Sequence, residues 1–125
     1  MAREEFDKEL SILESDLVVM SGMVEDALLR SVKALKNRDV DQSQRVIELD
    51  DRIDLREVEI ERSCVDLIRK EAPIASDLRR IITILQISNE LERMGDYAEG
   101  IAKIGLRIGD EALLKPLIDI PRIGD

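Results

Sequence analysis

The sequence predicts an all-α protein folded as an antiparallel three-helix bundle. Three long stretches carry apolar residues in alternating steps of three and four, the spacing that places them on one face of an α-helix. Two short interruptions separate the stretches, and short connections favour antiparallel neighbours. No stretch shows the strict alternation that is typical of a strand. We expect residues 1–110 to form the bundle and residues 111–125 to form a C-terminal segment that starts a fourth helical piece.

The first predicted helix spans roughly residues 3–36 and has a single buried stripe. Asp39 follows the interruption after it and is placed to cap the second helix, which spans roughly residues 39–70. Apolar residues recur there at intervals of seven: Val46, Ile53, Ile60 and Leu67. The stripe of the first helix consists of Phe6, Leu10, Leu13, Leu17, Met20, Val24, Ala27, Ser31 and Ala34.

The third predicted helix follows Pro73, which cannot lie inside a helix, and spans roughly residues 77–107. Gly105 and Gly109 are expected to end it. Beyond them, the apolar residues of the C-terminal segment need burial and predict contact with another copy of the chain. The expected stripe of the third helix is Leu78, Ile81, Ile82, Leu85, Ser88, Leu91, Gly95, Ala98 and Ala102.

Composition excludes several classes of function. The chain has 125 residues with 28 acidic against 19 basic side chains, a net charge of −9, which is the wrong sign for a nucleic-acid partner. The absence of histidine excludes catalytic triads, HExxH zinc sites and Glu-x-x-His di-iron ligands. A single cysteine excludes an intrachain disulfide. Because no run of 18 apolar residues occurs, we expect a soluble, cytoplasmic protein that is not inserted in a membrane.

Carboxylates line one face of the second and of the third helix, beside the apolar stripes. Like charges one turn apart repel each other, so such stripes favour a bound cation. Ligand sets made only of oxygen atoms select Mg, Ca, Mn or iron rather than structural zinc. A solvated acidic face, or pairing with Arg52, Arg56, Arg62 and Arg93, is the alternative interpretation. The two stripes are Asp50, Asp54, Glu57 and Glu61, and Asn89, Glu92, Asp96 and Glu99.

Three motifs give the chain a resemblance to the PhoU family, over about residues 5–110. Residues 48–54 read Glu-Leu-Asp-Asp-Arg-Ile-Asp and resemble the acid-x-x-x-Asp motif of the family's second helix. Residues 89–96 read Asn-Glu-Leu-Glu-Arg-Met-Gly-Asp and resemble the signature of its third helix. Residues 73–79 resemble the turn between these helices. Family members usually carry two such repeats, and this chain holds one.

The resemblance implies a non-enzymatic regulator that restrains phosphate uptake. It implies an adaptor between the Pst phosphate ABC transporter and a PhoR-type histidine kinase, peripheral to their membrane complexes. It also implies bound metal, often iron, and we expect a homo-oligomer, a dimer. With one repeat, the chain is expected to be either a fragment of a two-repeat protein or a single-repeat protein whose second bundle comes from another copy. The implied metal ligands are Asp50, Asp54, Asn89, Glu92 and Asp96.

Two other functions remain as alternatives. The chain could be a structural helical oligomerisation module whose carboxylates are only surface, or the regulatory domain of another ion-transport system. A metal-dependent hydrolase is disfavoured, because the sequence has no Gly-rich phosphate loop, no histidine and no marked nucleophile. Metal content separates the regulator from the structural module.

Overall fold

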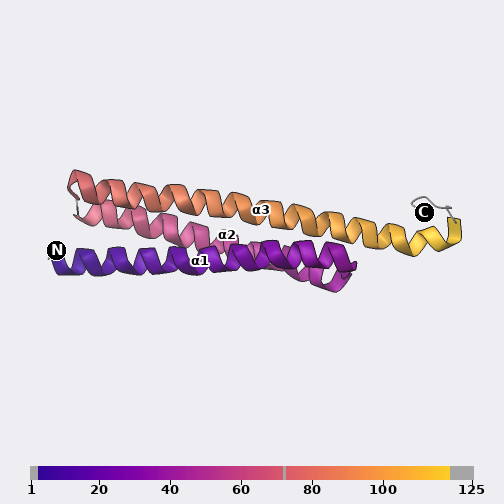
Figure 1. Ribbon diagram of the computed structural model, residues 1–125. Helices are drawn as coiled ribbons and strands as arrows, with labels where there is room; N and C mark the ends of the chain where they lie inside the picture. Colours follow the sequence, from indigo (N-terminus) through magenta and orange to yellow (C-terminus); the bar gives the residue numbers. More distant parts are fainter. Residues whose placement is uncertain (1–2, 72, 119–125) are drawn as a thin grey trace.

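The computed structural model describes residues 3–71 and 73–118, and describes side chains as far as residue 109. These residues form three α-helices, α1 (Arg3–Asn37), α2 (Val40–Glu71) and α3 (Ala75–Ile118). Consecutive helices run antiparallel, and the start of α1 lies at the same end as the connection between α2 and α3 (Figure 1). Each helix packs against both others. The predicted three-helix bundle is confirmed.

The stripes predicted for α1 and α2 lie in the core, together with buried residues of α3. Every stripe residue of α1 is buried except Leu17, which packs partly buried against the core. On α2, the four apolar residues at intervals of seven are all buried, and Cys64 lies among them at 0% exposure. The core is therefore almost wholly aliphatic, as the scarcity of aromatic residues requires. None of the described helices combines the length and apolar character needed to cross a membrane.

The buried stripe of α3 differs in part from the expected one: Ile81 is buried as expected, but Ile82 and Leu85 are not. Ile82 is 41% exposed and Leu85 is only partly buried, whereas Ile84 is 4% exposed. Residues 81–85 are nearly all apolar, so their spacing fits two faces of a helix equally well. The small residues that follow determine which face of α3 is buried. Ser88, Gly95, Ala98 and Ala102 are all buried, and counting back from them in helical steps of three, four or seven residues leads to Ile84.

The assignment of Ile84 to the buried face of α3 leads to a prediction about stability. Ile84→Ala should lower the free energy of unfolding by about 2–5 kcal/mol, because it leaves a cavity in the core. Leu85→Ala should lower it less, since the Leu85 side chain is already partly in water. Chemical denaturation measures both, with Ile82→Ala as the exposed control, expected within about 0.5 kcal/mol of the native chain. An Ile82→Ala cost equal to that of Ile84→Ala would contradict this assignment.

The expected end of the third helix at Gly105 and Gly109 is wrong, because α3 continues without a break to Ile118. A Cβ atom added at Gly105 would lie 2.6 Å from Ser43 Oγ, and one added at Gly109 would collide with a methyl group of Val40. These glycines therefore permit close packing against the first turns of α2. Beyond them α3 runs past the connection between α1 and α2 (Figure 1).

The expected fourth helical piece is therefore not separate within the described residues. Residues 111–118 are a continuation of α3, so the predicted boundary at residue 110 falls inside a helix. The side chains of Leu113, Leu114, Leu117 and Ile118, which were expected to need burial, lie outside the described side chains. Residues 119–125 lie outside the described residues altogether.

The connection between α1 and α2 uses standard helix-end chemistry. Arg38 has a φ of 56°, the left-handed conformation that ends many helices, and the Asp39 N–H donates to the Ala34 carbonyl over 2.8 Å. The Gln42 N–H donates to Asp39 Oδ1 over 3.0 Å, which confirms Asp39 as the cap of α2. The chain thus reverses direction within two residues.

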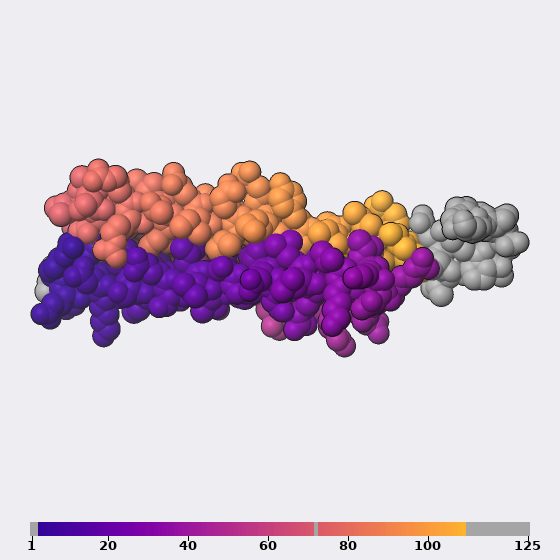
Figure 2. Space-filling view, viewed as in Figure 1, coloured from indigo at the N-terminus to yellow at the C-terminus, as the bar shows by residue number. Residues whose placement is uncertain are grey.

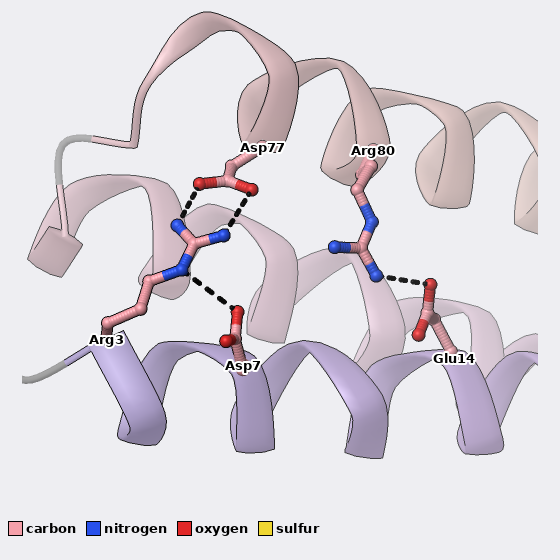
Figure 3. A network of polar contacts seen from close by, with 5 residues as sticks. All are labelled: Arg3, Asp7, Glu14, Asp77 and Arg80. Atoms are coloured by element: carbon pink, nitrogen blue, oxygen red, sulfur yellow. Dashed lines mark hydrogen bonds and ion pairs between the residues drawn. The ribbon is translucent and has the colours of Figure 1, made fainter.

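A network of ion pairs joins the beginnings of α1 and α3 (Figure 3). The Arg3 guanidinium donates to both carboxylate oxygens of Asp77, which is 3% exposed, and also pairs with Asp7 at 3.3 Å. The hydrogen bond from Arg3 lowers the pKa of Asp77. Arg80 pairs with Glu14 at 3.2 Å. These contacts fix the position of α3 along α1. They therefore also help to fix which face of α3 meets α2.

Candidate metal centre

Five carboxylates of α2 and α3 converge where the two antiparallel helices pack together. Asp50, Asp96 and Glu99 form one group, in which one ligand oxygen from each residue lies within 4.8 Å of the other two. Asp54, Glu92 and Asp96 form a second group by the same measure. Asp96 belongs to both groups. The two triads are therefore neighbours joined through one carboxylate, which is an arrangement that can bridge two cations.

Asp50 is the most buried of these carboxylates. It is 3% exposed, and its Oδ1 atom is buried without a hydrogen-bond partner. A Cβ atom added at Gly95 would lie 3.3 Å from that same oxygen, so the glycine lets α3 pass close to the carboxylate. Asp54 Oδ1 is also buried without a partner. Leaving such acceptors unsatisfied is unfavourable, which makes both oxygens candidates for a ligand.

Burial is the main cause that raises the pKa values of three carboxylates of the cluster, Asp50, Asp54 and Glu92. The pKa of Asp50 rises from 3.8 to about 7, first through burial and then through the negative charges of Asp54 and Glu99. Burial, followed by the charge of Asp96 and a hydrogen bond to it, raises the pKa of Glu92 to about 7. Burial and the charges of Asp96 and Glu99 raise the pKa of Asp54. The cluster thus concentrates negative charge, which an ion pair within the described residues offsets only at Glu99.

Among the described side chains, Lys103 is the one cation that pairs with a carboxylate of the cluster, and it reaches only Glu99. Arg93 pairs with Glu90 at 3.6 Å, and Lys103 pairs with Glu99 at 3.7 Å, with its own side chain 60% exposed. Within residues 3–71 and 73–109, no ion pair is formed by Asp50, Asp54, Glu92 or Asp96, nor by Arg52, Arg56 or Arg62 of α2. Pairing with arginines, one of the alternatives left open by the sequence, does not describe these four acids.

The donor set suits a hard or borderline cation. Three features fit a metal such as iron, Mn, Mg or Ca. One Oδ1 atom each of Asp50 and Asp54 is buried without a hydrogen-bond partner, and Gly95 leaves space beside that of Asp50. The acids also offer only oxygen atoms as ligands. A bound cation would neutralise negative charge that now raises the pKa values of Asp50, Asp54 and Glu92. The residues present therefore fit the metal that the family resemblance implies.

Four of the five predicted ligands lie in the two triads. Asn89, the fifth, is exposed on α3 three residues before Glu92 and stays a predicted ligand. Glu99 belongs to a triad but was absent from the predicted ligands, although it lies on the same helical face as Glu92 and Asp96. Its position ten residues after Asn89 was the signal that could have included it. Glu57 lies farther along α2, and burial raises its pKa as well.

Fold and site together define a small helical bundle that carries a carboxylate cluster between two antiparallel helices. The chain belongs to the PhoU family, because the PhoU domain family model matches residues 17–105. It is 41% identical over 113 residues to the phosphate-specific transport system accessory protein PhoU homolog of Aquifex aeolicus, covering 90% of this chain and 51% of that protein. The resemblance seen in the sequence motifs is confirmed.

Two further comparisons agree. The chain is 36% identical over 120 residues to the phosphate-specific transport system accessory protein PhoU of Escherichia coli K12, covering 96% of this chain and 50% of that protein. It also matches the crystal structure of PhoU from Pseudomonas aeruginosa with a TM-score of 0.82 and 38% identity, covering 85% of this chain and 51% of that one. The chain therefore spans about half the length of these relatives.

Proposed function

We propose that this chain is a metal-binding regulatory domain that restrains phosphate uptake. The observation that carries the proposal is the buried Oδ1 of Asp50, which lies against Gly95 without a hydrogen-bond partner amid converging carboxylates. An acidic surface without a ligand would place its charges in water, where they need no partner. The names of the relatives, accessory proteins of a phosphate-specific transport system, supply the process.

The metal ligands in this proposal are the two triads. One ion is held by Asp50, Asp96 and Glu99, and a second by Asp54, Glu92 and Asp96, with Asp96 shared. Asn89 adds an amide oxygen from the next turn of α3. Iron is the proposed metal, with Mn, Mg and Ca as the other cations that oxygen ligands accept. The ions offset like-charge repulsion and so lock α2 against α3.

The proposed action is that of an adaptor rather than an enzyme. The domain links the phosphate ABC transporter to a PhoR-type histidine kinase at the cytoplasmic face of their membrane complexes, and signals by its presence there. The rod formed by three long helices supports this proposal, since it offers extended surfaces to two partners at once. An oligomerisation module, or a regulator of another transport system, is the competing proposal.

Self-association is part of the proposal. α1 and α3 run side by side along one face of the rod (Figure 2). Two hollows follow their contact, and exposed apolar residues such as Leu29, Ile87 and Met94 line them. A homodimer that covers this face removes that apolar surface from water. Light scattering at micromolar concentration checks it, and a strictly monomeric mass would contradict it.

Phosphate uptake by cells tests the regulatory proposal. The chain is expressed in a bacterium from which its own PhoU protein has been deleted, and the initial rate of labelled phosphate uptake is measured. The native chain should lower that rate, and Asp96→Asn should abolish the effect. Glu59→Gln, which changes an exposed acid of α2 outside both triads, should behave as the native chain.

Two results would contradict the proposal in different ways. If the native chain leaves uptake unchanged while it is present in the cell as folded protein, the regulatory role is wrong. If Asp96→Asn restrains uptake as well as the native chain does, regulation does not need the metal centre. An effect on the uptake of another ion with none on phosphate would favour the competing transport system.

A further inference from the structure

A hollow of about 330 Å³ lies between α1 and α2, on a different side of α2 from the carboxylate triads. Its lining is dominated by charge and includes three arginines from two helices. A volume of this size is at the lower end of the range of small-molecule sites, about 300–1,000 Å³. We propose that it binds inorganic phosphate. The lining residues are Asp26, Arg30, Arg45, Glu48, Leu49 and Arg52.

The arginines of this hollow differ in how they are engaged. Arg30, on α1, pairs with Asp26 at 2.8 Å. Arg45 and Arg52 lie seven residues apart on α2, two turns along one helical face. Within the described part of the chain, neither of these two side chains forms an ion pair or a hydrogen bond. Two guanidinium groups are thus available for an oxyanion, for which their planar, forked donors are well suited.

The acids in the lining make the site selective. Asp26 is already paired with Arg30. Glu48 lies between Arg45 and Arg52 on α2, but it forms no ion pair with any side chain that the structure describes. An unpaired carboxylate repels a fully ionised anion such as sulfate. It can accept a hydrogen bond from the P–OH group that inorganic phosphate retains at neutral pH. A phosphate monoester dianion lacks that proton. The lining therefore favours inorganic phosphate over both sulfate and nucleoside monophosphates.

The hollow is close to the candidate metal centre in the chain. Leu49, which lines it, directly precedes Asp50, so the two sites share one turn of α2. Binding of phosphate to the hollow stands on its own lining. Its role as the signal that reports phosphate to the regulator rests on the proposed function above.

Calorimetric titration of metal-free protein tests the proposal. The protein is kept in a chelator and a phosphate-free buffer at constant ionic strength, so that phosphate cannot bind through metal at the carboxylates. Inorganic phosphate, sulfate and adenosine monophosphate are titrated separately. We expect saturable binding of one phosphate per chain and weaker binding of the other two anions.

Substitutions locate the site. Arg45→Gln and Arg52→Gln should each weaken phosphate binding about tenfold, the loss expected for one charged hydrogen bond. Glu48→Gln should narrow the preference for phosphate over sulfate. Arg62→Gln changes an exposed, unpaired arginine of the same helix outside the hollow and should leave affinity unchanged. Circular dichroism of each variant establishes that it is folded.

Three results would overturn the proposal. They are the absence of saturable phosphate binding by the native protein, unchanged affinity in folded Arg45→Gln and Arg52→Gln, and equal affinity for sulfate and phosphate. The last would indicate an unselective anion contact. None of these results bears on metal content or on the uptake assay, so failure here is distinguishable from failure of the proposed function.

Discussion

The metal-free protein should become more stable as the pH falls from about 8 to about 5. The pKa of Asp50 is raised to about 7 in the folded chain, against 3.8 for the ordinary side chain. Folding therefore favours the protonated form, and above pH 7 the ionised carboxylate opposes folding. As the pH falls below about 7, the folded state takes up a proton that the unfolded state does not, and stability rises. Glu92, with a pKa also raised to about 7, acts in the same direction.

The size of this effect is on the order of a few kcal/mol between the two ends of that range, because one pKa unit corresponds to about 1.4 kcal/mol. Chemical denaturation at a series of pH values, with chelator present, measures it. Asp50→Asn should be more stable than the native chain at high pH and should show a flatter profile. Glu59→Gln should follow the native profile. A native profile that is flat, or that falls toward pH 5, would contradict the burial assigned to Asp50.

Metal should reverse the order of stability between the native chain and Asp96→Asn. Without metal, Asp96→Asn should melt higher, because it removes repulsion from both triads. A ligand that binds only the folded state stabilises it by about 2.7 kcal/mol at one hundred times its dissociation constant. For a chain of this size that is a rise of about 10 °C in Tm. Asp96→Asn should lose most of this rise, because it removes a ligand common to both triads.

Thermal unfolding with and without manganese or ferrous iron measures this crossover. Asp54→Asn should lose part of the metal-induced rise, since it belongs to one triad only. Glu59→Gln should retain all of it. Equal rises in the native chain and in Asp96→Asn would exclude the shared-ligand arrangement, and small shifts that follow ionic strength alone would indicate a solvated acidic face.

The sequence predicted the helices where one face alone is apolar. On α1 and α2 the stripes are narrow, so spacing determined which residues are buried, Val46 and Ile53 among them. Near the start of α3, residues 81–85 are nearly all apolar, so their spacing did not determine which of them are buried, and Ile84 was missed. The two glycines near the end of α3 led to a wrong prediction of where the helix ends. Gly105 and Gly109 were expected to end it, but their lack of a side chain instead permits close contact with α2.

The sequence predicted most of the residues that form the candidate site, but not how deeply they are buried or how they are arranged. Spacing placed Asp50 and Asp54 on one face of α2, and Glu92 and Asp96 on one face of α3. Asp50 is buried against Gly95, and Asp96 is common to two triads. Both facts depend on how the helices pack, and the spacing of residues in the sequence does not reveal them. The arginine-lined hollow was missed for the same reason, because Arg30 and Arg52 come together only across two helices.

Metal content tests the central claim most directly. Protein purified without chelator and without a metal-affinity tag is analysed for iron, manganese, magnesium and calcium per chain. Two triads predict up to two ions per native chain, a large loss in Asp96→Asn, and no loss in Glu59→Gln. A native protein that carries no bound metal and takes up none on addition, or a native content that Asp96→Asn fully retains, would contradict the metal centre.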